Sequence, residues 1–457
     1  MTLLRSTFLS SLVNFEEHKY FHKWVAYSTL LFTIIHTVSH YFNYFGMEFI
    51  LSALSLSSAR KSHYSTYAGL TGHIMVFCMV LMYTAARGKI KQKAFELFWF
   101  VHHLFIPFYI CVILHSAGCV VRAAPDPFNP QHIKCKSYSS IAGTIPAFLL
   151  YCIERFVLRP YRSSLPTKVT QVTLHPGNTL EIRFLKKSFR YNPGQYLFLN
   201  VPGVSYLQWH PFTISSSPEE DYASVHIRLC GDWTNQVKDL FLKSKAGAQS
   251  SESKSDESSG EQQIQYPKIY VDGPFGTPAE DLTNYKSAIL IASGIGVTPA
   301  ASLLKSVWYK FYHRENLSLK KLYFIWLVRD AKAFSWFQSL LLSLEEKIPP
   351  SKLQITMHLT GQQNPDDIRR IVAQQEEKGD LNDAITLLKS RTLFGRPSWA
   401  KVFNDIQREQ TTLLQPEESL EIGVFFCGPR QLAKVLKDEC GKASNTQIQF
   451  QLKKEIF

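Results

Sequence analysis

Four histidines lie in or beside apolar, membrane-length segments of this 457-residue chain. His22 and His36 are fourteen positions apart, and His102 and His115 are thirteen apart. At about 1.5 Å of rise per residue, each pair spans roughly 20 Å of helix, which is most of a bilayer's hydrocarbon core of about 30 Å. Neutral imidazole is a good iron ligand. Two such helices side by side are therefore expected to hold two six-coordinate haems, one toward each membrane face.

For any one of these histidines, a hydrogen bond to a neighbouring helix is the alternative role. Two pairs of near-equal separation on two expected spans favour iron ligation. Fourteen residues at about 100° each come close to a whole number of turns, whereas thirteen place His102 and His115 on different faces of a straight helix. Pro107 lies between them and predicts a kink that would reduce this mismatch.

The histidines need a membrane scaffold, and composition indicates one. Residues 20–158 are strongly apolar and aromatic, whereas residues 160–457 read as a soluble α/β protein. Four segments approach the ~20 residues that a spanning helix needs, namely 24–45, 67–86, 98–118 and 141–158.

Basic residues gather in two flanks, at 87–93 and 155–162, and are sparser in the other loops. The positive-inside rule then places both termini in the cytosol. The net charge of +13 fits a protein beside anionic lipid headgroups, and its scattered or juxtamembrane distribution does not indicate a nucleic-acid binder.

Eight cysteines form no Cys-x-x-Cys pair. Cys119 and Cys135 fall in the expected outer loop, where a disulfide is allowed. Two free thiols are an equal alternative, because the sequence does not give the distance between them.

The soluble part predicts two further domains. Residues 166–240 alternate apolar and polar positions in short runs, a pattern typical of a small antiparallel barrel. Residues 243–265 are rich in Ser, Lys, Glu and Gln and predict a disordered insertion. Strand-like runs then alternate with amphipathic stretches, which indicates a doubly wound parallel sheet. The expected domains are an all-α membrane bundle at 1–160, the barrel at 161–282 and the α/β domain at 283–457.

A glycine-rich turn follows the first strand expected in the α/β domain. Gly294 and Gly296 lead into a helix through Thr298 and Pro299. Glycines there let backbone N–H groups approach a phosphate, and the helix N-terminus favours an anion. Pro299 stands where the usual dinucleotide fingerprint has its last glycine, so the motif is not the ordinary one.

Other candidates for the same crevice follow later strands. Cys427, Gly428 and Pro429 close one strand, Arg329 follows another, and Arg396 lies in the segment Phe394-Gly395-Arg396-Pro397. Ligands of open α/β sheets sit at the carboxyl ends of strands, and guanidinium groups suit a ribose 2′-phosphate. A tight Gly-Pro turn and ordinary surface arginines are the alternatives.

Two segments of the expected barrel could hold a flavin. In His210-Pro211-Phe212-Thr213 a hydroxyl stands beside an aromatic ring, which can bond a flavin edge and stack on its plane. Arg228, before the turn at 229–234, could neutralise a pyrophosphate. Ordinary strand-turn sequence is the alternative for both.

Taken together and in this order, these segments resemble the NADPH oxidases, most closely the phagocyte-type flavocytochrome b large subunit. The resemblance runs from about residue 21 to the end of the chain. The segments that carry it are 21–23, 35–37, 98–105, 210–213, 231–234, 271–277, 294–299, 304–310, 395–397, 427–429 and the terminal Phe457.

The resemblance implies a fold and a reaction. The fold is a transmembrane haem-binding bundle followed by a ferredoxin-reductase-like FAD barrel and an α/β nucleotide-binding domain. NADPH gives a hydride to FAD, and single electrons pass through two b-type haems to oxygen, which yields superoxide. His22 and His102 would ligate the cytosolic-side haem, His36 and His115 the outer one, and His40 would lie near the oxygen site.

The resemblance also implies the cofactor contacts. The expected flavin-site residues are His210, Pro211, Phe212, Thr213, Ile214, Ser215, Ser216, Arg228, Gly231 and Thr234, with Thr213 near the redox edge and Arg228 and Thr234 at the phosphates. The expected NADPH contacts are Gly294, Gly296, Thr298, Pro299, Arg329, Arg396, Cys427, Gly428 and Pro429. Gly273, Pro274 and Gly276 are further cofactor contacts. Phe457 would stack on the isoalloxazine until nicotinamide displaces it.

The family has six spans and this sequence predicts four. Residues 1–19 resemble the end of the family's second span, so the first span and most of the second are expected to be missing. A ferric-chelate reductase is the nearest alternative enzyme, and a truncated, non-catalytic partner-binding form is the alternative from another class. The implied partners are oxygen, the lipid bilayer, a small membrane subunit, cytosolic organiser and activator proteins, and a Rac-type GTPase.

Overall fold

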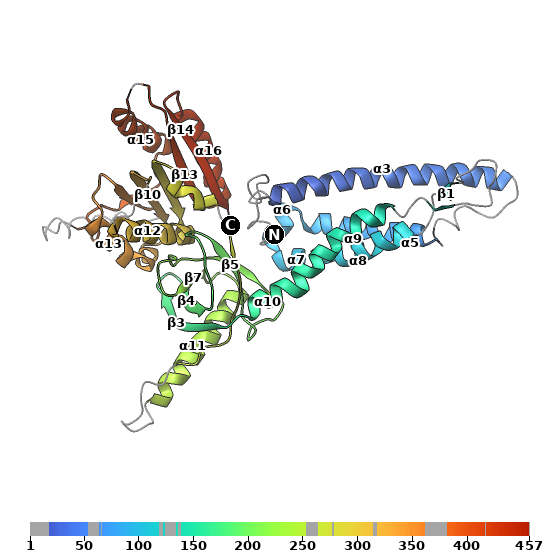
Figure 1. The fold of residues 1–457 in the computed structure, drawn as a ribbon, viewed down its shortest axis with the longest axis horizontal. Helices are drawn as coiled ribbons and strands as arrows, with labels where there is room; N and C mark the ends of the chain where they lie inside the picture. The colour runs from blue at the N-terminus through green and yellow to red at the C-terminus, as the bar shows by residue number, and fades with distance from the viewer. Residues whose placement is uncertain are drawn as a thin grey trace. The chain divides into compact units, whose positions relative to one another are not determined.

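The computed structural model divides after Pro160 into two compact units, which are described separately (Figure 1). The described residues are 18–53, 64, 66–117, 122–123, 134–135, 139–252, 264–276, 278–313, 318–361, 382–415 and 417–456. The predictions for Phe457 and for the Cys119–Cys135 pair therefore lie outside what the structure describes.

The first unit consists mainly of helices. They are α3 (His18–Ala53), α5 (Tyr67–Ala85), α6 (Gly88–Lys93), α7 (Phe95–His102), α8 (Phe105–Ala117) and α9 (Ser139–Cys152), and a π-helical turn, η2 (Ile153–Leu158), leads into α10 (Arg159–Ser164). Strands β1 (Arg122–Ala123) and β2 (Lys134–Cys135) pair antiparallel. Among the described residues, two helical segments are long and apolar enough to cross a membrane, Tyr67–Ala85 and Phe95–Ser116.

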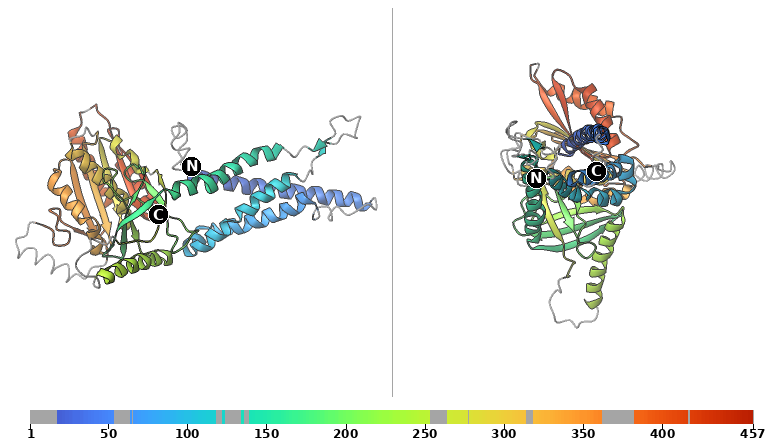
Figure 2. Two further views of the ribbon diagram at one scale, coloured as in Figure 1. Left: turned by 60° about the horizontal axis from the view of Figure 1, so that its bottom comes forward. Right: turned by 90° about the vertical axis from the view of Figure 1, so that its right-hand side faces the viewer.

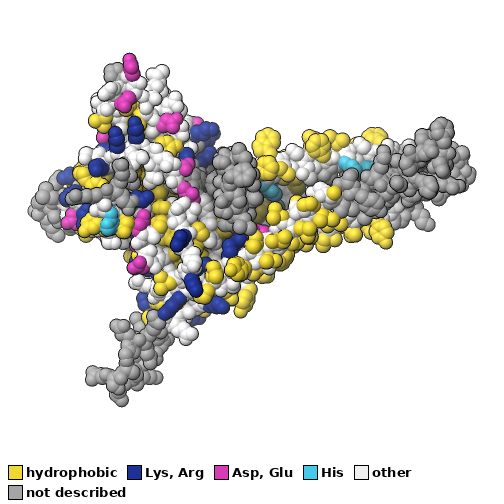
Figure 3. Space-filling view, viewed as in Figure 1, with side chains coloured by type: hydrophobic (Ala, Val, Ile, Leu, Met, Phe, Trp, Pro, Cys, Tyr) yellow, Lys and Arg dark blue, Asp and Glu magenta, His cyan; other side chains and the backbone are white. Residues whose placement is uncertain are grey.

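The other two expected spans, at 24–45 and 141–158, do not meet this criterion of length and hydropathy. Helix α3 contains the expected first span and continues beyond it, but its histidines and hydroxyl residues lower its hydropathy. Helix α9 ends at Cys152, where the backbone changes to π-helix. Apolar side chains nevertheless cover much of the visible surface of this unit (Figure 3). Trp24, Phe32 and Phe100 are among its exposed residues. Such a surface suits lipid and not water.

The expected kink in the third span is confirmed. Helix α7 ends at His102 and α8 begins at Phe105, so the break lies at residues 103–104. Pro107 is the third residue of α8. Proline has no N–H and its ring clashes with the carbonyl four residues earlier, which here belongs to His103. The proline therefore acts one turn before its own position.

The second unit begins with an antiparallel barrel made from two three-stranded sheets. The first has the order β3 (Thr167–His175), β4 (Thr179–Lys186), β7 (Ala223–Arg228), and the second has the order β6 (His210–Thr213), β5 (Tyr196–Asn200), β8 (Tyr270–Phe275). Along β4, Leu180, Ile182 and Phe184 are fully buried in the barrel core, whereas Glu181 and Arg183 point to the opposite face, as the period-2 alternation predicts.

Helix α11 (Asp232–Glu252) corrects the first part of the predicted disordered insertion at 243–265, and residues 253–263 lie outside what the structure describes. Residues 243–252 continue this helix, which extends away from the barrel (Figure 1). Its first turns are anchored because Trp233, Val237 and Phe241 are buried in the barrel core. The lysines, alanines and glutamine that follow are good helix formers, so their composition favours continuation of the helix.

The last part of the chain is a six-stranded parallel sheet, which confirms the doubly wound fold (Figure 2). Its order is β12 (Leu393–Phe394), β11 (Leu353–Leu359), β10 (Lys321–Val328), β9 (Ser287–Ser293), β13 (Leu420–Gly428), β14 (Ile448–Ile456). One face packs on α12 (Val297–Tyr312) and α13 (Gln338–Lys347), and the other packs on α15 (Trp399–Leu413) and α16 (Arg430–Ala443). The strand order reverses between β9 and β13, which is where ligands bind such sheets.

Candidate functional site

The structure brings both histidine pairs together. The ring centroids of His22 and His102 are 6.1 Å apart, and those of His36 and His115 are also 6.1 Å apart. Helix α3 supplies the first member of each pair, and α7 and α8 supply the second members. The kink lets two histidines thirteen residues apart both face α3.

This spacing fits an iron between each pair. A metal–imidazole bond is about 2.0–2.1 Å long, and the ring centre lies about 1 Å behind the nitrogen, so two imidazoles on opposite sides of one metal have centres roughly 6 Å apart. The residues present therefore fit a bis-histidine haem at each pair.

His40 lies beside the second pair. Its ring centroid is 4.5 Å from that of His36, one helical turn earlier, in an edge-to-face arrangement. The next turn adds Tyr44, whose ring is 6.5 Å from His40. This polar aromatic row follows the outer histidine pair along α3, where the sequence led us to expect His40.

In the barrel, strand β6 places His210 against Trp233 at the start of α11. Their rings stack with centroids 4.0 Å apart, and Phe212 lies 6.1 Å from the same indole. His210 Nε2 and Trp233 Nε1 are buried, and neither has a partner among the described residues. Burial lowers the pKa of His210, so its imidazole is neutral near pH 7. Buried polar atoms without partners are rare in native proteins, and polar atoms of a cofactor would satisfy these two.

Some expected flavin contacts have side chains that are already engaged inside the barrel. Ile214 is fully buried in the core. The Ser215 hydroxyl lies 2.7 Å from His226 Nδ1, and the Ser216 hydroxyl accepts from the Ser224 backbone N–H at 2.8 Å. The Thr234 hydroxyl accepts from the Gly231 N–H at 3.1 Å. These side chains fix the backbone around the site, and sequence alone did not separate that role from direct contact.

Strand β8 requires glycine near its end. Gly273 has φ +149°, and a Cβ at this position would lie 3.1 Å from Leu197 Cβ. The peptide bond to Pro274 is cis. Immediately before it, Asp272 accepts from Arg162 Nε at 3.0 Å, which ties the end of α10 to the barrel. Gly273, Pro274 and Gly276 thus form a tight backbone segment.

The glycine-rich turn lies at the end of β9, as expected. Gly294 adopts φ +56°, and its carbonyl accepts from the indole N–H of buried Trp326 at 3.1 Å. The Thr298 hydroxyl donates to the Ile295 carbonyl at 3.1 Å, so it holds the helix start. Pro299 is buried at the same start.

The structure places the Cys427–Pro429 turn next to this one. Strands β9 and β13 pair in register with Cys427 opposite Ala292, and a Cβ on Gly428 would lie 2.8 Å from Ser293 Cβ. Gly296, Pro299 and Cys427 line one small cavity at these strand ends. The two turns predicted to share a crevice are therefore side by side.

Cys427 is buried, and burial raises the pKa of its thiol well above the ordinary value. The thiol is therefore protonated and packs without acting as a nucleophile. On the other side of β13, Ile456 of β14 pairs with Gly428, so the described chain reaches the same crevice one residue before Phe457.

The two arginines follow strands at the same edge of the sheet. Arg329 directly follows β10, and Arg396 comes two residues after β12; both are exposed. Gly395, directly before Arg396, adopts φ +85° and donates its N–H to the Leu359 carbonyl at 2.9 Å. Their position at the carboxyl ends fits phosphate recognition.

A polar contact area joins the barrel to the nucleotide-binding domain. The Ser302 hydroxyl of α12 donates to the Ser216 carbonyl at 2.6 Å and accepts from the Gly194 N–H at 3.2 Å. One turn later, Lys305 pairs with Glu220 at 3.1 Å. Helix α12 starts at the glycine-rich turn, and the 215–220 loop follows the expected flavin strand, so these contacts link both cofactor sites.

Replacing Ser302 with alanine is expected to slow flavin reduction by NADPH and to lower stability. Two buried backbone groups lose their partner, which typically costs about 1–3 kcal/mol for each group left unsatisfied. Stopped-flow flavin reduction and thermal unfolding would measure both effects. Ser343→Ala is the control, because that exposed hydroxyl bonds only within its own helix; equal behaviour of the two variants would contradict the prediction.

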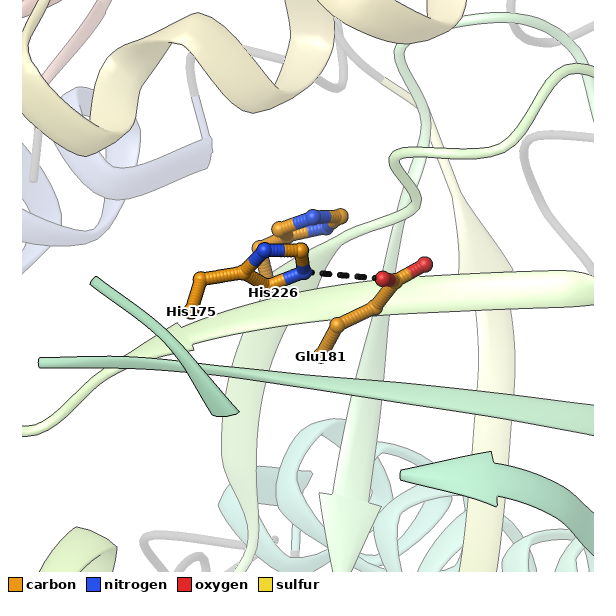
Figure 4. Close-up of side chains that lie close together, drawn as sticks. All are labelled: His175, Glu181 and His226. Carbon is orange, nitrogen blue, oxygen red and sulfur yellow. Dashed lines mark hydrogen bonds and ion pairs between the residues drawn. The ribbon is translucent and has the colours of Figure 1, made fainter. Parts of the chain in front are cut away.

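A further polar cluster lies on the outer face of the β3–β4–β7 sheet (Figure 4). Its members are His175, Glu181 and His226, whose nitrogen and oxygen atoms lie within 4.8 Å of one another. His175 Nε2 donates to Glu181 Oε2 at 2.9 Å (Figure 4), and Arg183 Nε donates to Oε1 at 2.6 Å. Because both carboxylate oxygens are occupied and one partner is a cation, this cluster is a buried ion network and not a metal site.

The network has a defined pH dependence. Burial alone would raise the pKa of Glu181, but the hydrogen bonds from His175 and Arg183 outweigh it and lower the pKa to about 2. Burial lowers the pKa of His226 to about 3, so this ring is neutral at physiological pH. A depressed carboxyl pKa stabilises the fold above the ordinary value of 4.5, and this stabilisation is lost as the pH falls toward 2.

Glu181→Gln is therefore expected to destabilise the protein by about 3 kcal/mol at pH 7, because one pKa unit corresponds to about 1.4 kcal/mol. The difference from the wild type should shrink progressively below pH 4.5. Denaturant unfolding at several pH values, followed by flavin fluorescence, measures it. Glu439→Gln removes only a surface pair with Lys442 and should change nothing, and a pH-independent effect at Glu181 would refute the assignment.

Three protein-family models match consecutive parts of the chain. The ferric reductase like transmembrane component matches residues 1–153, the FAD-binding domain matches residues 164–279, and the ferric reductase NAD binding domain matches residues 285–441. These matches follow the order of the helical unit, the barrel and the parallel sheet.

Several curated proteins are similar over nearly the whole chain. NADPH oxidase 1 of Mus musculus is 36% identical over 495 residues, covering 96% of this chain and 78% of that protein. A superoxide-generating NADPH oxidase heavy chain of Dictyostelium discoideum is 35% identical over 469 residues, covering 100% of this chain and 85% of that protein. NADPH oxidase 3 of Homo sapiens is 34% identical, covering 96% and 82%.

Proposed function

The chain belongs to the NADPH oxidase family, and we propose from this premise how its own residues carry electrons through a membrane. It is an oxidoreductase with FAD-binding and NAD-binding domains and a ferric-reductase-like transmembrane part. Its reaction passes electrons from NADPH through FAD to oxygen, which generates superoxide.

Two b-type haems, held by His22 with His102 and by His36 with His115, are the first part of the proposal. The observation that carries it is the equal 6.1 Å separation of the two ring pairs. Bis-histidine iron has no open coordination position, so oxygen would be reduced at the haem edge. His40, beside His36, would lie near that edge.

The soluble unit would supply the electrons. FAD, when bound, accepts a hydride and releases single electrons. His210 and Trp233 would offer their unpartnered nitrogens to it, with Thr213 near its redox edge and Arg228 near its phosphates. The turns at Gly294–Gly296 and 427–429 would hold the nicotinamide nucleotide, and Arg329 and Arg396 its 2′-phosphate.

Phe457, Gly273, Pro274, Gly276 and Gly231 complete the proposed cofactor contacts. The glycine-proline segment near the end of β8 would bring backbone close to a cofactor, because no side chain fits at Gly273. Phe457 would cover the flavin until nicotinamide displaces it, which the pairing of Ile456 with Gly428 supports.

The orientation and the partners are also proposed. The basic flanks at 87–93 and 155–162 support cytosolic termini. This orientation would place the barrel and the nucleotide-binding domain on the cytosolic side. A small membrane subunit, cytosolic organiser and activator proteins and a Rac-type GTPase are proposed partners on the phagocyte-type resemblance alone.

The full chain in lipid nanodiscs tests the proposal. We expect low-spin b-type bands in the reduced spectrum, two haems per chain, and NADPH-dependent product that superoxide dismutase removes. Reduction of iron chelates without superoxide would instead indicate a ferric-chelate reductase. Absence of b-type haem bands from the folded protein would indicate the non-catalytic partner-binding form. Flavin reduction without haem reduction would indicate an NADPH diaphorase that passes no electrons across the membrane.

A further inference from the structure

Thr71 of α5 touches the proposed outer haem ligand His115. Its Oγ1 lies 3.1 Å from His115 Nδ1, across 44 residues of sequence and between two packed helices. Thr71 is buried, so water does not compete for this contact. No motif in the sequence marked this threonine.

The hydrogen-bond network decides which atom donates. The Thr71 hydroxyl has a single proton, and its oxygen lies 2.5 Å from the Tyr67 carbonyl, which can only accept. The proton is therefore used there, and the hydroxyl accepts from His115 Nδ1–H. The neutral imidazole then carries its lone pair on Nε2, the nitrogen that remains available to iron.

The residue after Thr71 has a complementary role. Gly72 leaves room for the imidazole, because a Cβ there would lie 3.3 Å from His115 Cε1. The α5 surface facing His115 therefore offers the Thr71 hydroxyl, the Ala68 backbone carbonyl and one gap. The two oxygen acceptors favour the Nδ1–H tautomer, and the gap accommodates the ring.

We propose that Thr71 is a positioning residue that holds His115 in the Nε2-ligating tautomer and tunes the outer haem. This inference rests on the proposed function, in which His115 binds iron. A hydrogen bond to the distal nitrogen of a ligating histidine raises its basicity, which favours ferric over ferrous iron. The inner ligand His102 has no such partner among the described residues, so the two haems are supported unequally.

Thr71→Val tests the proposal, because valine has nearly the same shape and cannot hydrogen-bond. In the full chain, we expect the midpoint potential of one haem to rise while the other is unchanged. Thr71→Ser should restore the wild-type potential. Thr84→Val on the same helix is the matched control, since the Thr84 hydroxyl bonds only to the Val80 carbonyl of its own helix at 2.7 Å.

Gly72→Ala gives a second readout that does not depend on the hydroxyl. It should change the low-spin electron paramagnetic resonance signal of one haem, because the added methyl group turns the His115 ring. Unchanged potentials in Thr71→Val, or equal shifts in Thr71→Val and Thr84→Val, would overturn the role of Thr71. Absence of haem from the wild type would overturn the proposed function itself, and the assignment of Thr71 with it.

Discussion

Replacement of His102 or His115 by leucine is expected to abolish superoxide production while NADPH still reduces the flavin. Leucine fills a similar volume but offers no nitrogen, so the paired histidine on α3 would face a ligand position that is empty. The variant should lose one of two b-type haems by pyridine haemochrome assay. Stopped-flow spectra should still show flavin reduction, because the barrel and the nucleotide-binding domain belong to the other unit.

His103 provides the control for this experiment. It is adjacent to His102 in the sequence, but its Nδ1 bonds the Trp99 carbonyl at 2.7 Å and its ring packs on Trp99. His103→Leu should therefore retain both haems and its superoxide activity. Loss of haem from His103→Leu together with retention in His102→Leu would show that the pairing with His22 is wrong.

The parts of the fold that depend on local pattern could be predicted from the sequence. Buried strands of the parallel sheet are covered on both faces, so β9 and β10 read as continuous apolar runs. The kink followed from Pro107, although the sequence did not place it at residues 103–104. The end of α11 could not be predicted, because residues 243–252 carry no large apolar side chain and the helix is anchored by its buried first turns, at Trp233 and Phe241.

The candidate site was predicted by residue type, but not by what each side chain touches. Ser215 and Ser216 carry hydroxyls next to the flavin strand, yet these hydroxyls bond to His226 and Tyr191. Those partners come from other strands and loops, and no local spacing signals them. Ser302 was missed for the same reason, since its partners lie more than eighty residues earlier.

The nucleotide crevice depends on the absence of a side chain at Gly428, and Gly428→Ala is expected to raise the KM for NADPH strongly. A Cβ there would lie 2.8 Å from Ser293 Cβ and 2.8 Å from Phe426 Cζ. Neither contact is relieved cheaply, because the Ser293 Cβ can move only with the backbone at the end of β9 and the Phe426 ring is buried. Overpacking of this kind costs about 1–3 kcal/mol. If the whole cost opposes NADPH binding, the affinity for NADPH falls by roughly 5- to 150-fold.

Steady-state kinetics of NADPH-dependent dye reduction would measure the change, with flavin content as a check that the barrel remains intact. Gly441→Ala is the matched control in the same domain, because a Cβ on that α16 glycine would meet nothing within 4 Å and alanine favours helix. The expected order of KM values is Gly428→Ala far above both Gly441→Ala and the wild type. An unchanged KM in a folded, flavin-loaded Gly428→Ala protein would show that the two turns do not share one nucleotide site, because the methyl group must separate β13 from β9 at that point.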